Sequence, residues 1–169
     1  LASGRNPNIK AELELALREK SLAASLKILN SSREGDQASV VFPSVESVSI
    51  GRKSSDLWYF APHFGGVVNN ANIMLEGAYG EQFPAQFFDV YNPALQKGVL
   101  LSVSDDKALH KVFSFKKDSS VSLRVSYPMV EVPASGSIQL PSFEMRLHDG
   151  DWHEAVNICR GRDNAPAAR

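Results

Sequence analysis

The residues best suited to chemistry gather near the C-terminal end of the sequence, in "RLHDGDWHEAVNICRGRD" at residues 146–163. His148, His153 and three acidic residues lie between positions 148 and 154. Imidazole and carboxylate groups at this spacing could bind a metal ion or transfer protons. A zinc site would need a third ligand from elsewhere and partners that orient the imidazoles. We expect no metal site and no other cofactor.

The same stretch carries the signals of a helix start. Asp151 stands three residues before Glu154, which is the spacing of a capping box. In this motif the Asp151 side chain accepts from backbone N–H groups of the first turn, and the Glu154 side chain accepts from the N–H of Asp151. Apolar residues then recur at steps of three and four: Trp152, Ala155, Val156 and Cys159. The pattern predicts a short helix whose apolar face packs on the rest of the fold.

Composition excludes several classes of function. The 18 Lys and Arg residues nearly balance the 19 Asp and Glu residues, and no basic run occurs, so we expect no nucleic-acid partner. No apolar run is long enough to span a bilayer, so no membrane partner is expected. The single cysteine, Cys159, can form no internal disulfide. A chain of 169 residues fits one domain, which we place at residues 1–162, with a linker or tail at 163–169.

The first long segment alternates apolar and polar residues, although its Ala, Leu, Glu and Lys content would suit a helix. A helix would place Leu15 almost opposite Leu13, whereas two strands joined at residues 18–21 put the apolar residues on one face. We therefore predict a β-hairpin over residues 9–29, with Leu13, Leu15, Leu26 and Ile28 buried.

Further strand signals follow, separated by Gly, Pro, Asn and Asp. They are "ASVVFPSVESVSIG", "LWYFAP", "QFFDVYNP", "GVLLSVSDD", "KVFSFKKD", "VSLRVSYP" and "SIQLPSFEMRLHDG". Short strands at this spacing with one C-terminal helix predict an all-β fold, an antiparallel two-sheet β-sandwich.

Four phrases carry a resemblance to a known family. "LPSFEMRLHDGDWHEAVNICR" resembles the end of the N-terminal β-sandwich domain of large bacterial glycoside-hydrolase-like proteins, where "LP…VHxGDWHxAxxxYRxW" leads into a catalytic (β/α)8 barrel. "VVFPSVESVSIG", "EQFPAQFFDVYNP" and "GVLLSVSDDKALHKVFSF" resemble three strands of the same domain in the same order. The chain departs from the family in having "CRGRD" where aromatic residues follow the helix.

This resemblance implies a supersandwich of the galactose-mutarotase type that packs on a downstream barrel. It also implies a secreted or periplasmic protein. The nucleophile and acid/base carboxylates of such enzymes would lie on the barrel, so no residue here is expected to be catalytic. The resemblance thus makes the chain an accessory domain of a carbohydrate-active enzyme.

Sugar sites combine an aromatic platform with planar polar groups, and three places offer them. They contain Trp58, Tyr59 and His63 in "DLWYFAPHFGG", Tyr79 between two glycines, and Gln86 and Asp89 in "QFFDVYN". A core role competes with sugar binding at each place, and strand alternation puts Gln86 and Asp89 on opposite faces. Two other functions stay open: a stand-alone carbohydrate-binding module, and a small enzyme that uses histidines as bases, namely His63, His110, His148 and His153.

Overall fold

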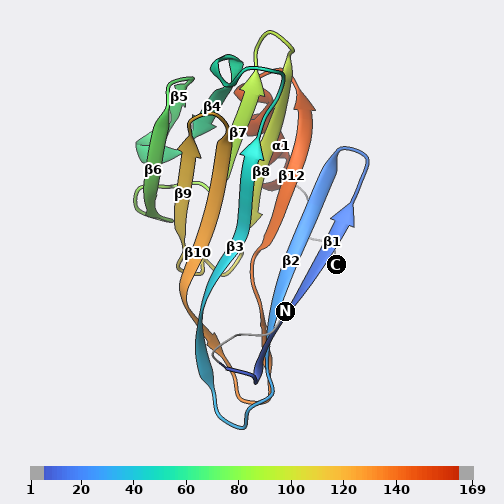
Figure 1. Ribbon diagram of the computed structural model, residues 1–169, viewed down its shortest axis with the longest axis vertical. Helices are drawn as coiled ribbons and strands as arrows, with labels where there is room; N and C mark the ends of the chain where they lie inside the picture. Colours follow the sequence, from blue (N-terminus) through green and yellow to red (C-terminus); the bar gives the residue numbers. More distant parts are fainter. Residues whose placement is uncertain (1–5, 164–169) are drawn as a thin grey trace.

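A computed structural model describes residues 6–163, which form twelve strands, two short 3-10 turns and one helix (Figure 1). The strands are β1 (Ile9–Leu17), β2 (Ser21–Asn30), β3 (Asp36–Val48), β4 (Trp58–Ala61), β5 (Val67–Asn69), β6 (Ile73–Ala78), β7 (Phe87–Asn92), β8 (Lys97–Ser104), β9 (Val112–Lys117), β10 (Val121–Val132), β11 (Ser137–Gln139) and β12 (Ser142–Asp149). The 3-10 turns are η1 (Ser54–Asp56) and η2 (His63–Gly65), and the helix is α1 (Trp152–Asp163). Of the predicted linker at 163–169, Asp163 is the last residue of α1 and the others lie outside the described residues.

The strands form two antiparallel sheets that pack face to face. The larger sheet has the order β1-β2-β12-β8-β7-β4-β5, with β11 also paired to β2, and the smaller has the order β3-β10-β9-β6. Side chains of the facing surfaces interdigitate, and β10 shows why: Val121, Leu123, Val125 and Tyr127 are buried at every second position. The predicted antiparallel two-sheet β-sandwich is confirmed.

The sequence patterns did not predict two strands, the short β5 and the edge strand β6. In β6, Leu75 is buried, but Met74 points outward and is largely exposed, so an apolar residue occupies a polar position of the alternation. Gly77 then replaces a core residue, because a Cβ there would lie 2.5 Å from the side chain of Gln82. Because of these two residues, β6 lacks the regular alternation of apolar and polar residues that marks a strand in a sequence.

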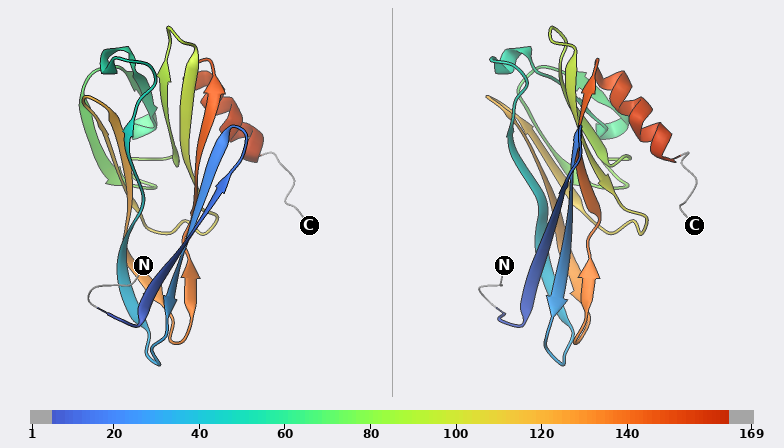
Figure 2. Two further views of the ribbon diagram at one scale, coloured as in Figure 1. Left: turned by 45° about the vertical axis from the view of Figure 1, so that its right-hand side comes forward. Right: turned by 90° about the vertical axis from the view of Figure 1, so that its right-hand side faces the viewer.

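The predicted hairpin is confirmed, but half of its predicted burial is wrong. Leu26 and Ile28 of β2 are buried, whereas Leu13 and Leu15 of β1 are 52% and 60% exposed. Figure 2 shows the reason: β1 and β2 extend the larger sheet past the border of the smaller one. Alternation predicted the inward face correctly: Ile9 at the start of β1 is buried on it, but the described residues leave that face uncovered from Leu13 to Leu17.

The helix α1 packs on the face of the larger sheet that points away from the smaller sheet (Figure 2). Ala155 is fully buried there, and the Trp152 ring stacks on Phe60 with the ring centroids 5.4 Å apart. The predicted apolar face of the helix is therefore confirmed. Because α1 covers their outer face and the smaller sheet covers their inner face, β7 and β8 are buried on both faces. No helix in the described part of the chain is both long and apolar enough to cross a membrane.

Candidate functional site

Two of the six predicted sugar-binding residues, Tyr79 and Gln86, line one cleft. The cleft has a volume of about 560 Å³ and lies where the loop before β7, the end of β8 and the helix α1 meet. Its walls are Tyr79, residues 84–87, residues 102–106 and Cys159. Residues from the middle of the chain and from its C-terminal helix line the cleft together. They place hydroxyl, amide and carboxylate groups beside aromatic rings.

The Tyr79 ring is held from behind by a buried ion pair. Lys111 Nζ lies 4.5 Å from the ring centroid, in a cation–π contact, and also donates to the Leu109 carbonyl at 3.0 Å and to Asp105. The side chains of Lys111 and Asp105 are 0% and 2% exposed. Because the ammonium occupies one face of the ring, the phenol is fixed at the wall of the cleft before any ligand arrives.

Asp105 orders the loop between β8 and β9 through three donors. Its Oδ1 accepts from the Lys107 amide at 3.0 Å, and its Oδ2 accepts from the Leu109 amide at 2.7 Å as well as from Lys111. Ala108, inside this loop, has a positive φ of 50°, which a non-glycine residue adopts at some cost in energy. The carboxylate thus holds a strained turn next to the cleft.

Gln86 contributes an amide group whose hydrogen bonding is incomplete. Its main-chain carbonyl accepts from the Val103 amide at 2.9 Å, which fixes its position beside β8. Its side-chain Oε1 is shielded from solvent and has no donor among the described residues. A shielded carbonyl without a donor is costly, so the fold pays for keeping this amide at the wall of the cleft.

The remaining predicted sugar-binding residues lie outside the cleft. Tyr59 is fully buried in the core against Phe115, so it has no surface to offer a sugar and we remove it from the candidates. Trp58 is half-buried on the outer face near Tyr91. The half-buried His63 ring packs between Phe64 and Phe83 at the η2 turn.

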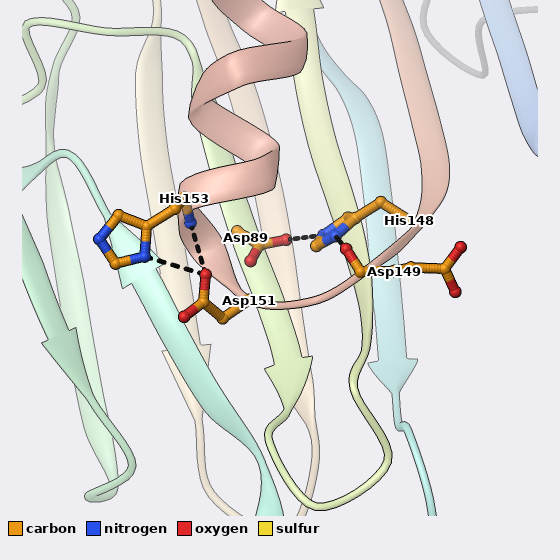
Figure 3. A network of polar contacts seen from close by, with 5 residues as sticks. All are labelled: Asp89, His148, Asp149, Asp151 and His153. Atoms are coloured by element: carbon orange, nitrogen blue, oxygen red, sulfur yellow. Dashed lines mark hydrogen bonds and ion pairs between the residues drawn. The ribbon is translucent and has the colours of Figure 1, made fainter.

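Asp89 lies under the start of α1, bound to His148 rather than open to a ligand (Figure 3). Both side chains are almost fully buried, and Asp89 Oδ1 lies 2.8 Å from His148 Nε2. Gly98 makes this possible, because a Cβ there would lie 2.2 Å from the imidazole ring. The buried Asp89 is therefore also removed from the sugar-binding candidates.

The geometry around His148 indicates its protonation state. Nδ1 lies 3.1 Å from the main-chain carbonyl oxygen of Asp149, so both ring nitrogens face oxygen acceptors. A neutral imidazole has only one N–H and cannot donate to both. Burial acts to lower the pKa of His148, but the hydrogen bond and charge of Asp89 outweigh it and raise the pKa above its ordinary value. The raised pKa favours the imidazolium form of His148 opposite the Asp89 carboxyl group.

Asp89 itself is poorly stabilised as an anion. Burial raises its pKa, against the opposing effects of His148 and the Val90 amide, and Asp151 adds a like charge nearby. Its second oxygen, Oδ2, has no hydrogen-bond partner within residues 6–163. The pair joins β7 to β12 below the helix, with one carboxylate oxygen left unsatisfied.

Figure 3 shows that His148, Asp151 and His153 of the C-terminal cluster form this pair and a helix cap. Asp151 Oδ1 accepts from the His153 amide at 3.0 Å and lies 2.9 Å from His153 Nδ1. The predicted cap by Asp151 is confirmed, but the described residues show no return bond from Glu154 to the Asp151 amide, so only half of the capping box forms. No group of three or more potential metal ligands occurs within residues 6–163.

Sequence analysis missed Asp105, Lys111 and Cys159 as residues of this region. Strand alternation offered one signal, since Lys111 shares a face with Phe113 and Phe115, where a lysine is unexpected. A charged residue in line with core residues predicts a buried ion pair. Nothing local could pair it with Asp105 across a loop or bring Cys159 beside Tyr79.

Comparisons with known proteins address the fold only. No family model matches the chain, and no curated protein matches it. Among solved structures, it is similar to the Slr1438 protein of Synechocystis sp. PCC 6803, with a TM-score of 0.57, 11% sequence identity, and coverage of 83% of this chain and 55% of that one. The chain thus spans about half the length of that protein, and at this identity the similarity shows a shared sandwich fold alone.

Proposed function

We propose that this chain is a non-catalytic accessory β-sandwich of a larger carbohydrate-active protein, and that its cleft beside α1 binds part of a carbohydrate. In the parent protein the sandwich would pack on a downstream catalytic barrel and shape its substrate cleft, as the sequence resemblance implies. The observation that carries the proposal is the cleft of about 560 Å³ in which the fixed Tyr79 ring meets Gln86 and Asp106.

This combination suits a sugar. The C–H face of a pyranose ring packs on an aromatic side chain, while amide and carboxylate oxygens accept hydrogen bonds from its hydroxyls. Gln86, half-buried at the wall of the cleft, offers its side-chain amide to one of them. Asp106 is exposed at the rim and can accept from a second.

An enzyme built on the histidines receives less support. None of the four lines the cleft. His148 is buried against Asp89, and His153 is bound to Asp151. A histidine base must reach the proton that it removes from the substrate. We therefore assign sugar binding, and not catalysis, to this chain.

The test is calorimetric titration of residues 1–169 with a panel of neutral, amino and acidic oligosaccharides. We expect one class to bind and the Tyr79→Ala variant to weaken its binding by about tenfold, the value of a lost aromatic contact. Phe64→Ala is the matched control, because Phe64 is an exposed aromatic residue outside the cleft.

Three results would contradict the proposal. They are no binding across the panel, binding that Tyr79→Ala leaves unchanged, and hydrolysis of aryl glycosides by the isolated chain that is abolished by changing one carboxylate. The last result would make the chain an enzyme in its own right.

A further inference from the structure

The inner face of the larger sheet runs from a buried centre to an exposed apolar border. One row of paired residues shows this, since Leu101 is fully buried in β8, Met145 is half-buried in β12, and Leu17 is 84% exposed in β1. Leu13 and Leu15 lie on the same face of β1. The three exposed leucines, Leu13, Leu15 and Leu17, form what we call the leucine stripe.

The strand that carries the stripe is also an open sheet edge. Arg18 and Ser21 exchange backbone hydrogen bonds across the hairpin turn, at 2.7 and 3.4 Å. Because hydrogen-bonded pairs alternate along an antiparallel ladder, every second residue from Arg18 backward binds β2, and the residues between them direct N–H and C=O groups outward. The three leucines of the stripe are among those outward-facing residues, and no strand within residues 6–163 pairs with the three leucines.

We propose that two copies of this chain associate through β1, antiparallel, around a two-fold axis at Leu15. In this register Leu15 lies opposite Leu15 of the second copy, and Leu13 lies opposite Leu17. The outward N–H and C=O groups of the stripe then bind each other across the axis. On the opposite face of the strand, Glu12 of each copy comes opposite Arg18 of the other.

Leucine pairing and charge together select this register. Moving the axis to Leu13 places Glu12 opposite Glu14, and moving it to Glu14 places that carboxylate opposite itself. Like charges directly opposite each other destabilise a strand pair. At the end of the proposed ladder, Lys10 of one copy would approach Lys20 of the other. Lys20 lies in the hairpin turn, and its Nζ is 3.7 Å from Asp149 Oδ2, so a carboxylate already offsets its charge. Moving the axis to Ala16 pairs Leu15 with Leu17 and Glu14 with Arg18, but it leaves Leu13 opposite Glu19. The axis at Leu15 is the register that pairs all three leucines with leucines and also brings opposite charges together.

The first test measures self-association of the chain by sedimentation velocity from micromolar to sub-millimolar concentration. We expect a monomer–dimer equilibrium that Leu15→Lys weakens by more than about tenfold, because two lysines would meet at the axis. Met74→Lys is the matched control: Met74 is 65% exposed on another edge strand, β6, and should leave the equilibrium unchanged.

A charge exchange tests the register itself. Glu12→Arg and Arg18→Glu should each weaken the dimer, and the double variant should restore it, since opposite charges again face each other across the axis. Within one copy Glu12 lies opposite Lys27, so the double variant cannot restore any pair inside the monomer.

Three outcomes overturn the proposal. A chain that is monomeric at every concentration would leave the stripe to another occupant, such as a further domain of the parent protein. A dimer that is indifferent to Leu15→Lys would use a different surface. Failure of the double variant to recover association would refute this register. None of these measurements depends on sugar binding in the cleft.

Discussion

Two buried ion pairs lie in different parts of the sandwich and differ in how completely they are satisfied. Asp105 and Lys111 support the cleft, and Asp89 and His148 lie below the start of α1. Asp105 receives donors at both oxygens, including two backbone amides. Asp89 has one oxygen on His148 and the other without a partner among the described residues.

The difference separates a fixed structural element from one that can change its protonation. A buried charge is tolerated when its partner and its hydrogen bonds compensate for lost hydration. Asp105 meets that condition, whereas Asp89 meets it in part, and burial raises its pKa. We therefore expect the first pair to carry more stability and the second to respond to pH.

Removing the cation of the first pair should have the largest effect. Lys111→Met would leave the Asp105 carboxylate buried without its counter-ion, at a cost of about 3–5 kcal/mol in the free energy of unfolding. Urea denaturation followed by fluorescence measures it.

Lys117→Met is the control for this variant. Lys117 is also buried, but its Nζ donates to the Asn70 carbonyl oxygen at 2.7 Å. Removing its ammonium group therefore leaves a neutral carbonyl, and not a carboxylate, without its partner. Equal losses in the two variants would show that the charge pair at Asp105 has no special weight.

Removing the imidazole of the second pair should cost less. His148→Phe keeps a ring over Gly98 but removes the donor to Asp89, which should lower the free energy of unfolding by about 1–3 kcal/mol. The loss is smaller than for Lys111→Met because Asp89, with its raised pKa, can take up a proton. A loss greater than that of Lys111→Met would reverse the comparison.

Loss of the helix cap should have a still smaller effect. Asp151→Ala removes the acceptor for the His153 amide and should cost about 0.5–2 kcal/mol of stability. Asp151→Asn keeps an acceptor without the charge and should recover most of it. The melting temperatures of the unchanged chain, Asp151→Ala and Asp151→Asn, measured at one pH, test this prediction. Equal melting temperatures for Asp151→Ala and the unchanged chain would show that the cap does not stabilise the fold.

The smallest expected effect is a pH dependence from His148. Its folded pKa is raised by Asp89, so the imidazolium stabilises the fold fully below the ordinary histidine pKa of about 6.5. This stability is lost as pH rises through the folded pKa. Urea titrations from pH 6 upward should show stability falling with pH, and the fall should be weaker in His148→Phe. An identical slope in both proteins would mean that His148 carries no extra proton.

Local pattern alone determined most of the strands and the face that each of them turns inward. Alternation predicted the hairpin and β10, and the spacing after Asp151 predicted the start of the helix. These features depend on neighbours within a few residues, where backbone geometry leaves few choices. The strand β6 was missed because its own alternation is broken by Met74 and Gly77.

Only the tertiary structure decided what covers each face and which distant groups meet. The alternation that buries Leu26 leaves Leu15 exposed, because coverage depends on how far the second sheet extends and not on the strand itself. Tyr79 became a wall of a cleft because Lys111 fixes its ring and residues near positions 86, 105 and 159 line the same cleft. Asp89 met His148 because the larger sheet places β8 between their strands and Gly98 lets the imidazole lie across it. These contacts join residues that are far apart in the chain, and their formation depends on the packing of whole sheets, which no local pattern encodes.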